Sequence, residues 1–335
     1  MKTHITHSLL AAAAACSLAN AQTTAYTTPV GYITHTVAPA GANPAAETYL
    51  SASLVEPNVY AGVTLSATAN TLNFSGTSVP ATLDATYVLE ITSGPSEGWW
   101  STVISSTSST IVLNDNFPIA TPTAVSVRKH STLQTFLGNN TPGFVTFNGI
   151  DPSDEVQVWD PITQGTIPFA YISGPDLADP NYPDGAWWDL GNSAIANDYP
   201  IVPGSSVRIK RIGNQLTFTS TGTVKTTKTQ VDLYINYNWI GTPLAVGGTL
   251  DGMSFNTQLI QFDGVSENFD ELTFLDPDQS ARPFAAIDGA PPTMYDLGNS
   301  VEAGSEPFAG GTGVIIRRIG NPSGTVTLPG SIVNP

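Results

Sequence analysis

Cysteine is nearly absent from this chain. The single cysteine, Cys16, lies in an N-terminal stretch that we interpret as a secretory signal peptide. Without that stretch the chain has no thiol, which excludes disulfides, thiolate metal sites and a cysteine nucleophile together. Histidine is also scarce, and only His35 and His130 follow the leader. They lack the i, i+4 spacing and the close acidic partners of zinc enzymes, so we interpret both as ordinary strand or surface residues.

Charged residues are few, and most of them are acidic. They make up 11% of the chain, against about 25% in ordinary globular proteins. The formal net charge is −16, and loss of Lys2 with the leader makes it one unit more negative. Because an acidic surface repels phosphate backbones and anionic lipid headgroups, we expect no nucleic-acid partner.

No apolar run is long enough to cross a bilayer as a helix, which takes about 20 residues. The apolar segment from Ser8 to Leu18 is followed by Ala19-Asn20-Ala21, a small-residue cleavage site. We therefore predict a signal peptide over residues 1–21 and an exported protein that is not transmembrane. Its final place would be the periplasm, the outer surface or the medium. Cys16 follows small residues, so a lipoprotein anchored through Cys16 is the alternative.

Helical periodicity is missing as well. Proline (26) and glycine (30) interrupt the chain every few residues, and the segments between them are short and rich in β-branched side chains. Such segments are typical of sandwiches and barrels rather than of βαβ units. We predict an all-β fold of tandem β-sandwich or β-barrel-like units. The expected strands are 87–92, 101–105, 110–113, 124–128, 155–159, 207–212, 215–219 and 231–237.

The C-terminal two-thirds of the chain contains an internal duplication. Short blocks recur there in the same order, a pattern that indicates repeated structural units. The paired blocks are 147–149 with 262–264, 154–161 with 270–277, 169–172 with 284–287, 188–193 with 295–300, and 207–214 with 314–321. We predict one β repeat over residues 131–230 and a second over residues 231–335.

The N-terminal part of the mature chain does not share these blocks. We predict that residues 22–130 form a β unit of their own. Two arrangements remain open: this unit is an independent domain, or it is inserted into the first repeat after an opening strand at residues 31–37.

Each repeat carries an arginine at the end of an apolar strand face. Strand residues alternate between faces, so Arg211 and Arg318 each share a face with two aliphatic side chains. A buried arginine needs a carboxylate partner, because an unpaired buried charge is strongly unfavourable. Asp189 and Asp296 precede the two arginines at equal spacing, so we predict the pairs Asp189–Arg211 and Asp296–Arg318. The alternative partners are Asp160 and Asp276.

Two adjacent tryptophan pairs are candidates for ligand binding, Trp99-Trp100 and Trp187-Trp188. In a strand, one ring of each pair faces the core and the other faces outward. An outward ring beside acidic and amide side chains can stack on a sugar ring. The alternatives are a subunit interface, where tryptophan is enriched, and packing in the core.

An acidic, proline-rich loop is the one candidate for metal binding. Asp176, Asp179 and Asp184 lie in it, and the second repeat lacks the loop. Oxygen-rich loops suit Ca²⁺, although the spacing is not that of an EF-hand. The alternatives are a calcium site and a solvated acidic loop with no cofactor.

Three stretches resemble a known protein family. Pro29-Val30-Gly31-Tyr32, the segment from Tyr87 to Gly98, and the segment from Val314 to Asn321 are similar to a family of uncharacterised exported proteins from Verrucomicrobia. The resemblance covers most of the mature chain in the same order. It implies export and a β-rich fold, and it implies no activity, cofactor or catalytic residues.

No set of residues in the sequence requires a particular chemistry. We therefore expect an exported structural or cell-surface protein that self-associates through exposed strand edges or tryptophans. A module that binds carbohydrate or another ligand, through Trp100 or Trp188, is the alternative. We do not expect an enzyme, because no paired carboxylates and no metal ligands stand out as a catalytic set.

Overall fold

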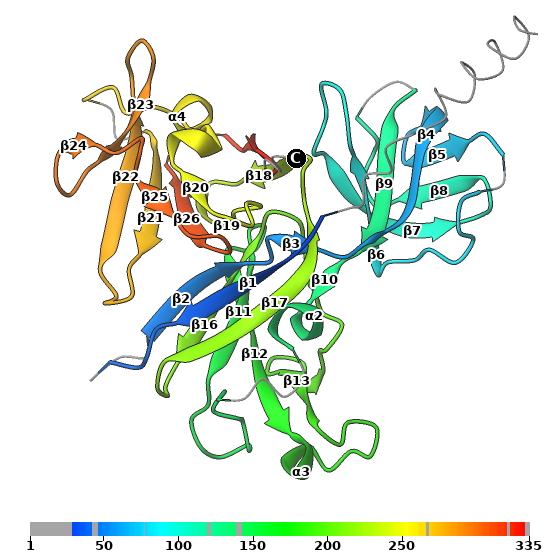
Figure 1. The fold of residues 1–335 in the computed structure, drawn as a ribbon, viewed down its shortest axis with the longest axis horizontal. Coiled ribbons are helices and arrows are strands. Elements are labelled where there is room, and N and C mark those ends of the chain that lie inside the picture. The colour runs from blue at the N-terminus through cyan, green and yellow to red at the C-terminus, as the bar shows by residue number, and fades with distance from the viewer. Residues whose placement is uncertain are drawn as a thin grey trace, which may run out of the picture.

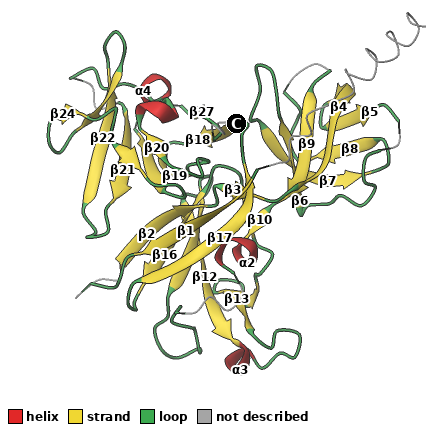
Figure 2. Cartoon of the chain, viewed as in Figure 1, coloured by secondary structure: helices red, strands yellow, loops and turns green. Residues whose placement is uncertain are grey.

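The computed structural model describes residues 29–41, 46–76, 78–118, 122–138, 143–265, 268–319 and 322–331. The predicted signal peptide, with Cys16, lies outside these residues. Strands dominate the regular structure, and the helices are short turns (Figure 2). The prediction of an all-β fold is confirmed. In the described part of the chain, no helix combines the length and the apolar character needed to cross a bilayer.

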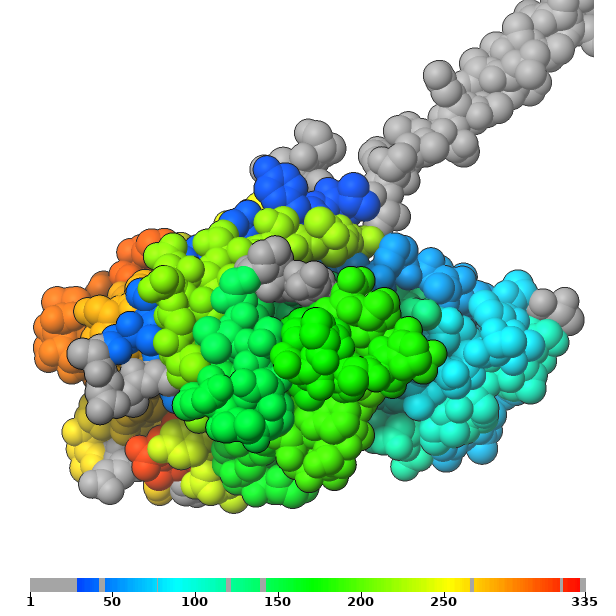
Figure 3. All heavy atoms as spheres, turned by 90° about the horizontal axis from the view of Figure 1, so that it is seen from below, coloured from blue at the N-terminus to red at the C-terminus, as the bar shows by residue number. Residues whose placement is uncertain are grey.

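Residues 58–129 form a closed six-stranded barrel, which lies at one end of the molecule (Figures 1 and 3). Successive side chains of a strand point to opposite faces, and inward ones such as Leu72, Leu89 and Ile111 fill the interior. The strand order around the barrel is β4-β5-β8-β7-β6-β9. The strands are β4 (Asn58–Thr68), β5 (Thr71–Phe74), β6 (Tyr87–Ile91), β7 (Trp100–Ser106), β8 (Thr110–Leu113) and β9 (Ala124–Lys129).

The central unit has a six-stranded sheet and a smaller sheet that share one core. The large sheet has the order β14-β13-β12-β11-β16-β2, the smaller one is β1-β17-β3, and β10 pairs with β15. Phe169, Trp187 and Ile209 of the large sheet share their cluster with Phe218 of the small one. The elements are β1 (Val30–Val37), β2 (Ala46–Ser51), β3 (Leu54–Val55), β10 (Ser131–Thr132), α2 (Leu133–Leu137), β11 (Glu155–Asp160), β12 (Gly165–Ser173), α3 (Gly174–Leu177), β13 (Gly185–Asp189), β14 (Ala194–Ile195), β15 (Pro200–Ile201), β16 (Ser206–Arg211) and β17 (Leu216–Val224).

The C-terminal unit repeats this arrangement. Its large sheet has the order β24-β23-β22-β21-β26-β19, β18 pairs with β27, and β20 pairs with β25. Phe255, Phe284 and Ile316 are buried in its core. The elements are β18 (Thr229–Leu233), β19 (Asn236–Gly241), β20 (Gly248–Thr249), η1 (Asp251–Met253), α4 (Phe255–Gln258), β21 (Asp270–Leu275), β22 (Ala281–Ile287), β23 (Thr293–Asp296), β24 (Val301–Glu302), β25 (Pro307–Phe308), β26 (Gly313–Arg318) and β27 (Gly324–Leu328).

The opening strands of the chain complete the central unit. β1 pairs along its length with β17, and β2 pairs with β16. These strands occupy the places that β18 and β19 take in the C-terminal unit. The barrel therefore follows β3 and precedes β10, between two parts of one unit. The boundary expected at residue 130 is therefore not a boundary between units, because β1 and β2, which precede it, pair with β17 and β16, which follow it.

The two similar units contact each other through equivalent positions. Leu50 bridges to Thr312, and Ile240, in the strand equivalent to that of Leu50, bridges to Ser205. The backbone repeats this exchange, because Ser51 N donates to Gly311 O at 2.8 Å and Gly241 N donates to Gly204 O at 2.8 Å. Each unit thus uses the same two positions to contact the other unit, and such a contact has local two-fold symmetry. The tandem units are arranged like the two subunits of a homodimer.

Both repeated arginines are buried, but their predicted carboxylate partners are wrong. Arg211 is 3% exposed and Arg318 is 4% exposed. Arg211 pairs with Asp154, and Arg318 pairs with Asp270 at 2.7 Å. The reason is strand register, since Asp270 lies directly opposite Arg318 on the neighbouring strand. The need for a partner was predicted correctly, and the repeated Asp-Glu block supplies it.

Asp189 and Asp296 stabilise the turns that follow them instead. Asn192 N donates to Asp189 Oδ1 at 2.9 Å, and Asn299 N donates to Asp296 Oδ1 at 2.9 Å. A carboxylate that accepts hydrogen bonds from the following backbone mimics a turn. The alternative partners also bind elsewhere, Asp160 to Thr163 and Asp276 to Arg282.

Candidate functional site

A cleft of about 500 Å³ lies where the barrel, the central unit and the C-terminal unit meet. Four of the six tryptophans of the chain line it. Trp99 and Trp100 come from the barrel, Trp159 from the central unit and Trp239 from the C-terminal unit. Polar lining residues are Asp115, Ser205, Gln230, Asp232, Tyr234, Asn238 and Thr325.

The barrel wall of the cleft is built at the start of β7. Gly98 has a φ of +90°, and a Cβ there would lie 2.7 Å from the carbonyl carbon of Lys228. Only glycine allows this close approach of two backbones, and Gln230 N then donates to Gly98 O at 2.9 Å. The indole nitrogen of Trp100 donates to Gln230 O at 3.0 Å. Trp99 packs edge-on against Phe117, with ring centroids 5.6 Å apart.

Another part of the cleft lining is a stack of two tryptophans. The rings of Trp159 and Trp239 lie 5.0 Å apart at an angle of 22°. Trp159 Nε1 donates to Tyr237 O at 2.9 Å, which anchors the central unit to β19 of the C-terminal unit. The guanidinium carbon of Arg208 lies 4.7 Å from the centroid of the Trp239 ring, a cation–π contact. Trp239 is only 6% exposed, so Trp159 supplies more of the accessible surface of this stack.

Two carboxylates are held in place at the cleft. Ser101 Oγ donates to Asp115 Oδ2 at 2.8 Å, and Thr325 Oγ1 donates to Asp232 Oδ1 at 2.9 Å. Burial raises the pKa of Tyr234, and the negative charges of Asp232 and Asp115 raise it further. Both carboxylates therefore lie near the same phenol group, which stays protonated and can donate a hydrogen bond.

The arrangement combines flat aromatic surfaces with fixed hydrogen-bonding groups. Binding sites for small molecules have this composition, in which apolar and aromatic walls give affinity and a few polar groups fix orientation. A pyranose ring presents an apolar face of C–H groups and a rim of hydroxyls, and therefore matches such a cleft. A nucleic-acid base would also stack, but the acidic lining repels its phosphate.

The structure separates the two tryptophan pairs that the sequence singles out. Trp99 and Trp100 line the cleft, and both are half-buried. Trp187 is 1% exposed, and its indole nitrogen donates to Gly138 O at 3.0 Å inside the central core. Trp188 is half-buried in β13 and does not line the cleft.

Sequence reasoning missed the other two tryptophans of the cleft. Trp159 lies in a repeated block in which the second copy has Leu275. This difference between the two copies was a signal that Trp159 has a role outside the repeated fold. Trp239 follows a predicted strand over 231–237 that the structure divides into β18 and β19. The sequence has no signal that these two residues share a cleft with Trp100, because the cleft forms only where the three units pack together.

The acidic loop does not bring its three aspartate carboxylates together. Among the described residues, no group of three or more histidine, cysteine, aspartate or glutamate side chains could hold a metal ion. Asp176 accepts a hydrogen bond from Ser173 Oγ at 2.5 Å, and Asp179 accepts one from Asn181 N at 2.9 Å. The carboxylates of Asp176, Asp179 and Asp184 therefore do not gather around a common point.

No family model matches this chain, and no curated protein and no solved structure is significantly similar to it. The resemblance to exported proteins of Verrucomicrobia stays a prediction.

Proposed function

We propose that the chain is an exported protein that binds carbohydrate in the tryptophan-lined cleft. The observation that carries this proposal is the gathering of four of the six tryptophans, from three separate units, around one cleft of about 500 Å³. Trp99 also packs against the barrel core, but Trp100, Trp159 and Trp239 belong to none of the three hydrophobic clusters. Export follows from the predicted signal peptide over residues 1–21.

Each part of the cleft has a role in this proposal. Trp100 and Trp159 offer ring faces for the apolar side of a sugar. Asp115 and Asp232 accept hydrogen bonds from its hydroxyls, and Tyr234 donates one. Because the two carboxylates are already fixed by hydroxyl donors, little side-chain freedom is lost on binding.

Binding to a glycan array by the chain from Gln22 to Pro335 tests this function. We expect the chain to bind a defined set of glycans, and Trp100→Ala to weaken that binding about tenfold or more, the loss typical of a central aromatic contact. Trp100→Phe keeps a ring but loses the indole nitrogen, so it should retain most of the affinity. Calorimetry with the best glycan gives the dissociation constants.

Trp188→Ala is the matched control, because Trp188 is also a half-buried strand tryptophan but lies outside the cleft. It should leave affinity unchanged. Equal losses for Trp100→Ala and Trp188→Ala, or no glycan bound by the unaltered chain, would exclude carbohydrate binding in this cleft.

The second candidate is an exported structural protein that self-associates. One surface favours it: Val59, Ala61, Val63 and Leu65 alternate along β4 and are all exposed on the outside of the barrel. Val63 is 56% exposed and Leu65 is 65% exposed. An apolar stripe of this kind is typical of an interaction surface, and we propose a second copy of the chain as its partner.

Light scattering over a range of protein concentrations tests self-association. The unaltered chain should form assemblies that grow with concentration, and the double variant Val63→Lys with Leu65→Lys should stay monomeric. Val246→Lys is the control, since Val246 is 85% exposed on another unit. A monomeric unaltered chain at every concentration rules out this role.

A further inference from the structure

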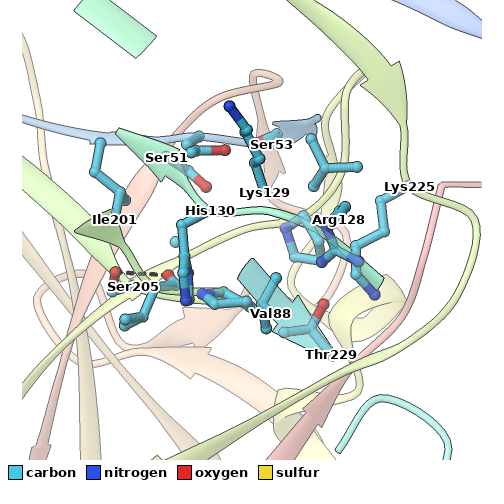
Figure 4. Close-up of a pocket in the computed structure, with 18 residues that line it drawn as sticks. Ser51, Ser53, Val88, Arg128, Lys129, His130, Ile201, Ser205, Lys225 and Thr229 are labelled. Carbon is cyan, nitrogen blue, oxygen red and sulfur yellow. Dashed lines mark hydrogen bonds between the residues drawn. The ribbon is translucent and has the colours of Figure 1, made fainter. Parts of the chain in front are cut away.

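Several buried polar atoms with no hydrogen-bond partner belong to residues around one small cavity. Among the described residues, Arg128 Nη2, His130 Nδ1 and Thr229 Oγ1 are buried and unpaired. All three residues line a cavity of about 30 Å³ between the barrel, the central unit and the start of β18 (Figure 4). Each residue is less than 5% exposed. Because buried polar groups are almost always satisfied, we expect the cavity to be occupied by a species that hydrogen-bonds to them.

The charges around this cavity do not cancel. Glu90, 1% exposed, pairs with Arg128 at 2.5 Å and also with Lys225. Burial lowers the pKa of Lys225 to about 8 although Glu90 opposes that shift, so the amine is mostly charged at pH 7. The nearby pair Lys228–Glu97, 3.7 Å apart, is neutral as a pair. Lys129, which is exposed, also lines the cavity, so positive charges outnumber negative charges around it.

Each of the unpaired atoms can donate a hydrogen bond. The guanidinium of Arg128 can only donate. Burial lowers the pKa of His130 to about 4, with a further contribution from Arg128, so its ring is neutral at pH 7. His130 Nε2 lies 3.2 Å from Thr102 Oγ1. When that hydroxyl donates to Nε2, the ring proton lies on Nδ1, which then donates as well. The hydroxyl of Thr229 completes the set of three donors.

We propose that the cavity binds one monovalent anion of the size of chloride. Three donors and an excess positive charge fit an anion, which accepts hydrogen bonds and neutralises the cluster. A water molecule could accept from these donors, but it would leave the excess positive charge uncompensated. The volume exceeds the roughly 10–15 Å³ that a water-sized occupant requires, so an ion of the size of chloride has room in it.

The anion would connect parts of the chain that are distant in sequence. Arg128 and His130 lie at the end of the barrel strand β9, and Thr229 begins β18 of the C-terminal unit. Figure 4 shows Arg128, Lys225 and Thr229 grouped beside His130 at the junction. An occupied cavity therefore holds the barrel against the tandem units, at the same junction that forms one wall of the tryptophan cleft.

Halide titration of thermal stability tests this site. The chain from Gln22 to Pro335 is melted in sodium chloride or sodium bromide, with the ionic strength held constant by sodium gluconate, whose anion is much larger than either halide. We expect the melting temperature to rise with chloride and bromide and to level off, as for a single site that binds only the folded protein. Crystals grown in sodium bromide should show a bromide anomalous peak between Arg128 and Thr229.

Thr229→Val removes one donor without changing side-chain shape or breaking the Glu90 ion pairs. It should weaken the halide response about tenfold or more, the effect of losing one hydrogen bond to an ion. Thr217→Val, on the exposed face of β17, is the matched control and should respond like the unaltered chain. A melting temperature indifferent to halide, or a cavity that contains water and no bromide in the crystal, would overturn the proposal.

Discussion

At the scale of single residues, the two histidines of the described chain are buried. His35 is 2% exposed and His130 is 4% exposed. His35 Nε2 lies 2.9 Å from Ser220 Oγ, and its ring stacks on Phe218 with centroids 4.9 Å apart. His35 lies in strand β1, as the strand interpretation expected, and His130 directly follows β9. The alternative of surface residues is wrong for both. Burial without a carboxylate partner favours the neutral imidazole.

This burial makes the stability of the fold dependent on pH. Burial lowers the pKa of His35 from 6.5 to about 4, so between those values the unfolded chain binds a proton that the folded chain does not. The stabilising contribution is complete above pH 6.5 and is lost as the pH falls toward 4. The loss should be about 2–3 kcal/mol for this residue.

Urea denaturation at a series of pH values measures this effect. His35→Gln keeps a polar partner for Ser220 but does not titrate, so its unfolding free energy should fall less steeply between pH 6.5 and 4. If the slope of unfolding free energy against pH is the same in His35→Gln as in the unaltered chain, His35 has the same pKa in the folded and unfolded chain. The remaining slope includes His130, whose pKa is also lowered to about 4, by burial and then by Arg128. Near pH 4 it also includes carboxylates such as Asp296, whose pKa is lowered by hydrogen bonds from Asn299.

At the scale of elements, each large sheet is stabilised by a buried ion pair between neighbouring strands. Asp270 at the start of β21 faces Arg318 at the end of β26. Its carboxylate also accepts a hydrogen bond from Ile260 N at 2.9 Å. Asp154 does the same for β11 and β16, and accepts one from Ile212 N at 2.9 Å. Each carboxylate thus joins two strands and a loop.

Removing the charge of Asp270 should therefore be costly. Asp270→Asn leaves the guanidinium of Arg318 buried and unpaired, so we expect the unfolding free energy to drop by about 3–5 kcal/mol. Asp276→Asn is the control, because Asp276 pairs with Arg282 in a partly exposed position, where ion pairs contribute about 0–1 kcal/mol. Chemical denaturation of both variants gives the comparison, and similar losses would contradict the assigned role of Asp270.

The elements show how far the sequence could predict this structure. Alternation and turn residues located β6, β7, β8 and β9 to within about two residues, because these signals are local. The partners of Arg211 and Arg318 depend on register, which local pattern does not determine. The repeated Asp-Glu blocks supplied two more retained carboxylates, Asp154 and Asp270, but Asp189 and Asp296 are retained as well, so the repeat alone did not decide between them. The cleft was not predictable, because it depends on packing between units.

At the scale of the whole molecule, the barrel is a separable insertion. Asn58 on β4 lies directly opposite Arg128 on β9, so the chain enters and leaves the barrel at neighbouring positions. The barrel also has a hydrophobic core of its own, around residues such as Leu89 and Val127. Insertions whose two ends lie close together can be removed without stretching the host.

Deleting residues 57–130 and joining the ends with a short glycine-serine linker should leave the tandem units folded. We expect one cooperative unfolding transition for the remaining chain, because both large sheets and their cores stay complete. Glycan binding should fall sharply, since Trp99 and Trp100 leave with the barrel. Circular dichroism during thermal unfolding and calorimetry with the best glycan measure the two effects. A chain that loses cooperative unfolding would show that the barrel is an integral part of the central unit.

The local two-fold symmetry has a consequence for stoichiometry. The position equivalent to Trp159 in the C-terminal unit is Leu275. The position equivalent to Trp239 in the central unit is Tyr49, because Trp239 pairs with Ile315 and Tyr49 pairs with Arg208 at matching places in the two sheets. The counterpart position therefore has no tryptophan stack, and the barrel faces only one side of the pair. The two similar units therefore share one tryptophan-lined cleft and not a symmetric pair of such clefts. A titration should saturate at one glycan per chain, and the molecule would present one face to its ligand.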